Sequence, residues 1–228
     1  MANDLIISGK GTVISGSYNS VKISGKSDGC GDISAIDYQA SGKTCIDGSL
    51  NIEKKASLSG KNEYNNITCC DLDGSGKLKV LSNILCKDTM FFSGALSVTE
   101  ITAKSFEFCI GSHSKVANIK ADTIKITKGE NNLKKFAKDR PGIIDLNIFG
   151  FKFKHEFDLD KMSDNADENA VLESKSIMGK DINISCTNAD EVNGDNVIIG
   201  SGCHIKKVFY RGKYSCDSSS SVEVVEKI

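Results

Sequence analysis

The sequence contains no tryptophan and a single proline, Pro141, whereas glycine occurs 21 times. A chain that is poor in proline and rich in glycine suits short strands joined by tight turns. No apolar run approaches the ~18 residues that a membrane-spanning helix needs. The opening Met1-Ala2-Asn3-Asp4 lacks the basic region and the apolar core of a signal peptide. We therefore expect a β-rich cytoplasmic protein that does not insert into a membrane.

An excess of charge of either sign is also missing. The chain has 29 Lys and Arg residues against 30 Asp and Glu residues, which gives a formal net charge of −1. A balanced chain has no global attraction to nucleic acid, so we expect no nucleic-acid partner. With 39% hydrophobic and 26% charged residues, the 228 residues have enough apolar material to fold.

Cysteine is abundant, but its pattern does not favour disulfides. The nine cysteines are odd in number and include no Cys-x-x-Cys pair, whereas secreted disulfide frameworks are typical of short chains with a signal peptide. We therefore expect reduced thiols that pack as small apolar side chains. Cys70 follows Gly60 by ten residues, as Cys86 follows Gly76. If these glycines belong to a repeat, Cys70 and Cys86 should stack in adjacent turns.

A repeated tripeptide, Ser-Gly-Lys, is the strongest positive signal. It occurs five times between Ser8 and Lys77. Its glycine continues at spacings of 16 to 18 residues, at Gly9, Gly25, Gly42, Gly60, Gly76, Gly94, Gly111 and Gly129. Such a period is too short for two helices and their turns, whereas stacked turns ~4.8 Å apart share one core and pair their backbones. The sequence predicts an all-β, single-stranded parallel β-helix (β-solenoid) in which glycine closes each turn.

The repeat weakens near Lys128. We predict N-terminal β-solenoid turns over 1–129, an insertion over 130–175 and C-terminal β-solenoid turns over 176–228. The insertion is expected to contain a short helix before Pro141, a Phe-rich β-hairpin over 144–159 and an acidic loop. Phe151, Phe153 and Phe157 of the hairpin form a candidate partner surface.

Two local motifs imitate ligand sites without completing them. Gly42-Lys43-Thr44 resembles the end of a P-loop, but Asp37 occupies the position of the first required glycine. Asp71 and Asp73 resemble the start of an EF-hand, but Ser82 occupies the position of its bidentate glutamate. The three histidines are far apart in the sequence: His113, His155 and His204. We therefore expect no catalytic residue, no cofactor and no metal site.

The lysines of the repeat are expected to form a column along one corner of the solenoid. They are Lys10, Lys26, Lys43, Lys61 and Lys77. Such a column could bind a polyanion or an acidic lipid surface. The alternative is that they are solvated side chains that discourage aggregation at the sheet edge.

Both repeat regions resemble the bactofilin-like, polymer-forming cytoskeletal proteins of Gram-positive bacteria. The resemblance rests on Ile6-Ile7-Ser8-Gly9 with Tyr18 to Gly25, and on Asp195 to Ile205 with Val208 to Gly212. It implies a right-handed β-helix and a scaffold that joins end to end into filaments without nucleotide and positions partner proteins of the cytosol or the membrane. It also implies that the chain is not an enzyme. A monomeric adaptor that displays the hairpin, and a β-helix enzyme, are the alternatives.

The two ends of the predicted solenoid are candidate self-association surfaces. Repeat sequence begins at Leu5, after too few residues for a capping helix, and the stretch from Ser221 to Ile228 still resembles a strand. Monomeric solenoids cover such ends with a polar cap. The candidate self-association residues are Leu5, Ile7, Val13, Val222, Val224 and Ile228.

Overall fold

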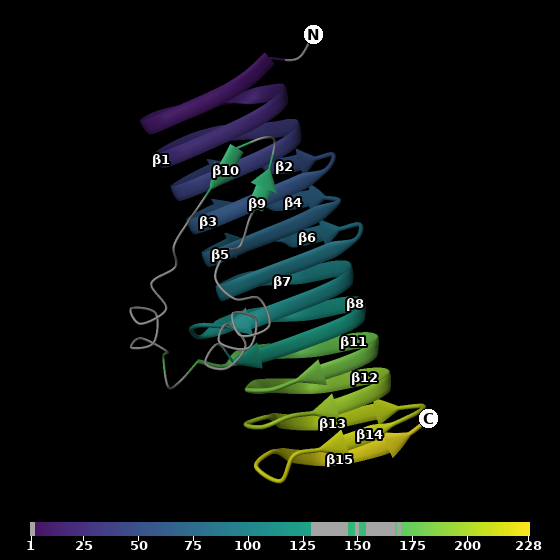
Figure 1. Ribbon diagram of the computed structural model, residues 1–228. Helices are drawn as coiled ribbons and strands as arrows, with labels where there is room; N and C mark the ends of the chain where they lie inside the picture. The colour runs from purple at the N-terminus through teal and green to yellow at the C-terminus, as the bar shows by residue number, and fades with distance from the viewer. Residues whose placement is uncertain (1–2, 129–145, 149–150, 154–166, 168–169) are drawn as a thin grey trace.

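The computed structural model describes residues 3–128, 146–148, 151–153, 167 and 170–228. In this part of the chain the fold is a parallel β-solenoid of about nine turns whose bridged residues lie about 17 positions apart, and it has no helix (Figure 1). This confirms the predicted fold class. The right-handed sense, which the resemblance alone implies, stays a prediction.

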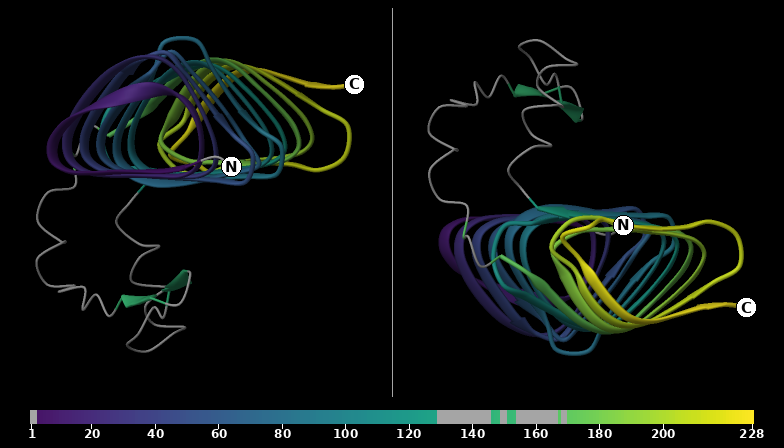
Figure 2. Two further views of the ribbon diagram at one scale, coloured as in Figure 1. Left: turned by 90° about the horizontal axis from the view of Figure 1, so that it is seen from above. Right: turned by 90° about the horizontal axis from the view of Figure 1, so that it is seen from below.

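Thirteen strands form one sheet, in the order β15-β13-β12-β11-β8-β7-β5-β3-β1-β2-β4-β6, with β14 paired to β12. All of its printed pairings are parallel. Its strands are β1 (Asn3–Asp47), β2 (Ser49–Ile52), β3 (Lys55–Tyr64), β4 (Asn66–Cys69), β5 (Asp71–Val80), β6 (Asn83–Cys86), β7 (Thr89–Ile110), β8 (Ser114–Lys128), β11 (Leu172–Ile184), β12 (Thr187–Ile199), β13 (His204–Tyr210), β14 (Tyr214–Cys216) and β15 (Ser221–Lys227). Seen along the axis, the turns are stacked loops around a common interior (Figure 2).

The two repeat regions stack directly on each other, although some forty residues separate them in the sequence. β8 pairs with β11 in parallel, with Ile124 opposite Ile182. β11 begins at Leu172, before the predicted boundary at 176, and the Ser114 amide already donates to the Val171 carbonyl at 2.9 Å. The C-terminal turns therefore resume slightly earlier than the sequence pattern suggested.

Part of the predicted hairpin is described. β9 (Leu146–Ile148) and β10 (Phe151–Phe153) form a separate antiparallel pair, with Ile148 opposite Phe151. The predicted short helix, the acidic loop and Phe157 lie outside the described residues.

The glycine series forms a continuous ladder at one corner, as the spacing predicted for Gly9 to Gly111. Gly42, Gly60, Gly76 and Gly94 are opposite one another in successive turns. Gly60 has a φ of 83°, and a Cβ added there would overlap the Gly42 carbonyl oxygen. Glycine therefore meets two demands at this corner, a left-handed backbone and close approach of one turn to the previous one. Gly129 lies outside the described residues.

One interior column shows how the core is built. It consists of aliphatic residues that are opposite one another from turn to turn: Ile33, Leu50, Ile67, Ile84, Ile101, Ile119, Ile177, Val192, Val208 and Val225. We call it the aliphatic column. The members from Ile33 to Val208 are at most 1% exposed. Burying each such side chain contributes about 1.5–3 kcal/mol, so stacking of the turns is the main source of stability.

The N-terminal half of the core also encloses a polar network. The Tyr38 and Tyr64 hydroxyls are 3.2 Å apart, and the Tyr64 hydroxyl donates to Asn62 Oδ1 at 3.3 Å. Asn62 Nδ2 in turn donates to the Ser59 carbonyl at 3.0 Å. Burial raises the pKa of both tyrosines above the ordinary value. The hydrogen bonds let these polar groups remain buried at low cost.

The predicted stacking of Cys70 with Cys86 is wrong by one residue. Cys69 is opposite Cys86, with the two Sγ atoms 3.3 Å apart and both side chains buried. Cys70 is part-exposed. The shift arises at the preceding corner, where the pairing offset grows from 16 residues between Tyr64 and Val80 to 17 in the next strand pair.

The buried thiol pair predicts a contrast in alkylation rates. The hydrogen bond with Cys69 and burial raise the pKa of Cys86 far above its ordinary value, so little thiolate is available to react. Iodoacetamide should modify the exposed Cys30 and Cys216 in the native protein, and Cys69 and Cys86 only after denaturation. Mass spectrometry of the labelled peptides measures the difference. Native labelling of Cys86 as fast as Cys216 would contradict this placement.

Candidate functional site

The C-terminal face is the outer side of the last turn, formed by β15. β15 pairs with β13 on one side, and among the described residues no strand covers its other edge. Val222 and Val225 are opposite Ile205 and Val208, which are fully buried. Val225 thus ends the aliphatic column, yet it is 43% exposed. An open strand edge therefore borders an uncovered apolar cross-section.

Two predicted residues of this face have different positions from those expected. Val224 is opposite Lys207 and is exposed on the outer surface, so it does not point into the solenoid. The interior position belongs to Val225, which the sequence analysis missed because the strand bends between Val222 and Val225. Ile228 is exposed, and its amide donates to the Tyr210 carbonyl at 2.9 Å.

The N-terminal face is the outer side of the first turn, within β1. Leu5 and Ile7 are partly buried and pack against the core cluster. A Cβ added at Gly9 would meet no atom within 4 Å, whereas one at Gly25 would overlap the Gly9 carbonyl. The ladder therefore ends at Gly9 with open space beyond it.

Val13 does not belong to the accessible part of the N-terminal face, because its side chain is buried. Two isoleucines that the sequence analysis did not select are instead among the most exposed apolar side chains. Ile6 is 69% exposed and Ile14 is 67% exposed. Alternation of apolar residues would place them outside the core, but only the structure shows how far they extend into solvent.

The lysine column is present in the arrangement that the repeat predicted. Lys43, Lys61 and Lys77 are opposite one another, and Ala95 takes the same place in the next turn. Contacts between the stacked glycines place Lys26 and Lys10 in the two preceding turns. All five side chains are exposed.

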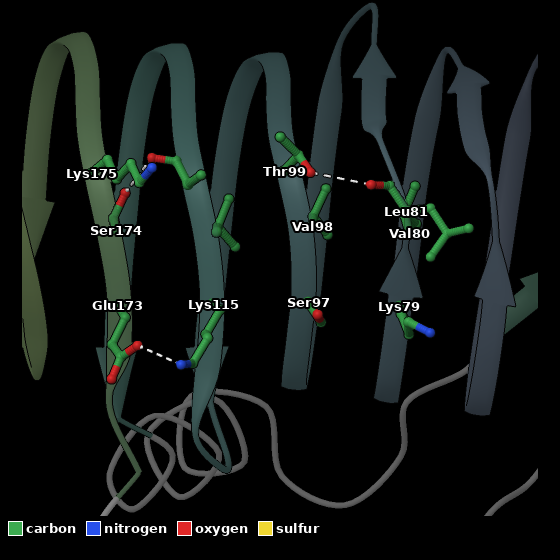
Figure 3. Close-up of a pocket in the computed structure, with 12 residues that line it drawn as sticks. Lys79, Val80, Leu81, Ser97, Val98, Thr99, Lys115, Glu173, Ser174 and Lys175 are labelled. Carbon is green, nitrogen blue, oxygen red and sulfur yellow. Dashed lines mark hydrogen bonds and ion pairs between the residues drawn. The ribbon is translucent and has the colours of Figure 1, made fainter.

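A shallow, open depression of about 430 Å³ lies on the outer surface between β5 and β11 (Figure 3). Val80, Val98 and Val116 contribute to its lining. At its edge Lys115 pairs with Glu173 at 3.0 Å, as the dashed line in Figure 3 shows. Three hydroxyl groups line the depression, of which Thr99 Oγ1 donates to the Leu81 carbonyl at 3.1 Å and Ser174 Oγ to the Ala117 carbonyl at 3.3 Å. Neither a histidine nor a cysteine lines it, so these hydroxyl groups have no imidazole base beside them there.

The motifs that imitate ligand sites are parts of ordinary strands. Thr44, which would be the metal-binding hydroxyl of a P-loop, is buried in the core. Asp73 pairs with Lys55 at 3.4 Å, and Asp71 Oδ1 accepts from the Thr89 amide. Within the described ranges there is no group of three or more His, Cys, Asp or Glu side chains that could hold a metal ion. No helix that could span a membrane occurs in those ranges.

Comparison with known proteins gives one partial match. The chain is 45% identical over 58 residues to the uncharacterized protein YhbE of Bacillus subtilis (strain 168), a match that covers 25% of this chain and 24% of that protein. The aligned part thus spans about a quarter of the relative's length. No family model matches the chain, and no solved structure matches it.

Proposed function

We propose that this protein is a non-enzymatic scaffold of the cytoplasm that self-associates end to end into filaments, in the manner of the bactofilin-like cytoskeletal proteins that its repeats resemble. The observation that carries the proposal is the termination of the aliphatic column at Val225. Nine buried members precede Val225, and at the C-terminal face the tenth is uncovered beside an open strand edge. Exposed strand edges are templates for pairing with another chain.

Exposure of apolar side chains supports the same proposal. Of ten large apolar side chains that are exposed among the described residues, five belong to the first or the last turn: Ile6, Ile14, Val224, Val225 and Ile228. Of these, Val225 continues an interior column, whereas Ile6, Ile14 and Val224 face outward beside the end faces. An end-to-end contact would extend the backbone ladder and bury apolar surface at both faces, which is favourable without any nucleotide. If the contact does not close into a ring, it generates a filament.

Electron microscopy together with sedimentation velocity tests the proposal. Purified protein at about 10–50 µM, within the micromolar range where exposed strand edges associate, should form filaments without added nucleotide. A protein that stays monomeric under these conditions would exclude the scaffold and favour the monomeric adaptor. A filament that requires ATP or GTP would also contradict the proposal.

A further inference from the structure

At several places on the outer surface of the solenoid, opposite charges pair across adjacent turns. Lys180 pairs with Asp122 at 3.1 Å, and Arg211 pairs with Asp195 at 3.1 Å. Further pairs of the same kind join Lys125 to Glu107, Lys206 to Asp190 and Lys115 to Glu173. The hydrogen bond and the charge of Asp190 raise the pKa of Lys206. Each turn thus neutralises part of the charge of its neighbour.

The lysine column differs because like charges, not opposite ones, occupy matching positions in successive turns. Among the described residues, none of its five ammonium groups forms an ion pair or a side-chain hydrogen bond. Glu63, two residues after Lys61, pairs with Lys79 instead. Adjacent turns are ~4.8 Å apart, so like charges face one another along the whole column. An external anion would relieve this repulsion.

The surroundings of the column supply further hydrogen-bond donors. Ser41, Ser59, Ser75 and Ser93 are opposite one another, two residues before the lysine position of each turn. Their hydroxyl groups form a second column beside the ammonium groups, in which the Ser41 hydroxyl already donates to the Ile23 carbonyl at 3.4 Å. Ammonium and hydroxyl groups are both donors to phosphate oxygens.

The shape of this surface favours a flat partner over a chain. The depression of Figure 3 runs from Lys79 in β5 to Glu173 in β11, and no column lysine lines it. Proteins that bind single-stranded nucleic acid combine a basic groove with aromatic side chains for stacking, and the column positions contain only lysine, with Ala95 beyond Lys77. A row of five exposed lysines over four steps spans roughly 19 Å, and all five can approach one plane together.

We propose that the lysine column binds the anionic lipid headgroups of a membrane surface. The protein lies against the bilayer along this corner and does not enter the hydrocarbon region. Each lysine that reaches an anionic surface strengthens binding about fivefold. The binding weakens as salt rises, because the charges are exposed and the Debye length falls to about 3 Å at 1 M.

Vesicle flotation tests the proposal, since filaments alone do not float. The protein should float with vesicles that contain phosphatidylcholine and phosphatidylglycerol, but not with pure phosphatidylcholine vesicles, and high salt should release it. Replacing all five column lysines by glutamine should weaken binding at least about tenfold. The matched control replaces five exposed lysines that make no ion pair among the described residues: Lys54, Lys87, Lys120, Lys207 and Lys213. Both variants have the same formal net charge, and only the control should keep binding.

Three outcomes would overturn the proposal: no flotation of the wild-type protein with anionic vesicles, equal loss of binding in both variants, or binding of single-stranded RNA in place of vesicles. Circular dichroism melting should show that both variants fold. The proposal does not depend on filament formation, because flotation is measured equally well for a variant whose C-terminal face is blocked. Its failure is therefore distinguishable from failure of the scaffold proposal.

Discussion

Substitution of Val225 by lysine should abolish filaments and leave a folded, soluble protein. The new ammonium group would stand at the end of the aliphatic column, where any chain that covers the C-terminal face would bury it without a partner. Burial of an unpaired charge is strongly unfavourable, so association should weaken at least about a hundredfold. Sedimentation velocity and electron microscopy measure the change.

Ile198 provides the matched control for this experiment. It is 46% exposed, close to the 43% of Val225, but it lies on the outer surface of β12 in the middle of the C-terminal turns. Its neighbours in the adjacent turns are Asn183 and Ser215, which are uncharged. Ile198→Lys should leave the filaments intact. Filaments of unchanged length in Val225→Lys, or equal loss in both variants, would show that the C-terminal face is not the contact.

Substitution of Gly60 by alanine should destabilise the subunit by at least about 2 kcal/mol, with a melting temperature about 4–8 °C lower. Alanine at a φ of 83° has a left-handed backbone, which costs about 1–2 kcal/mol. The methyl group would in addition overlap the Gly42 carbonyl oxygen, so the two turns must separate and lose contacts on both sides. Thermal unfolding followed by circular dichroism measures the effect.

Gly9→Ala separates the two causes. Gly9 has a φ of 84°, which matches that of Gly60, but an added Cβ there meets no atom within 4 Å. The stability of Gly9→Ala should be measured in the Val225→Lys background, in which the subunits stay apart. There, Gly9→Ala should lower the free energy of unfolding only by the backbone part of the Gly60→Ala effect. An equal loss of stability in both alanine variants would mean that close stacking of the turns is not what requires glycine.

The repeat could be read from the sequence because glycine is required at each corner of the ladder. Because backbone geometry requires glycine at the same place in every turn, the period of the glycines stays visible even where the other residues vary. The position of the lysine column follows directly from this period. The side chains between the corners gave a weaker signal. The sequence did not predict the hydrogen-bonded interior of Tyr38, Tyr64 and Asn62, since their pattern is compatible with either surface.

The errors occurred where the strands bend. One corner contains three residues, Leu81, Ser82 and Asn83, where the preceding corner contains two, Asn65 and Asn66. A count from the nearest glycine therefore slips by one residue. That slip accounts for the wrong cysteine pairing. At the C-terminal face, both Val222 and Val225 point inward although strict alternation would have chosen Val224. A bend that adds one residue reverses the faces of all residues beyond it.

The end of the glycine ladder at Gly9 provides a way to test whether the N-terminal face is covered by another subunit. Along the ladder, the Cβ that each glycine lacks would point toward the preceding turn, and at Gly9 that direction leads out of the molecule. In a single subunit, a methyl group at this position would add only the cost of the left-handed backbone. If another subunit stacked on this face, the methyl group would overlap the backbone of that subunit. A comparison of Gly9→Ala with wild type at low and at high protein concentration would therefore report, through melting temperature alone, whether that face is free or occupied.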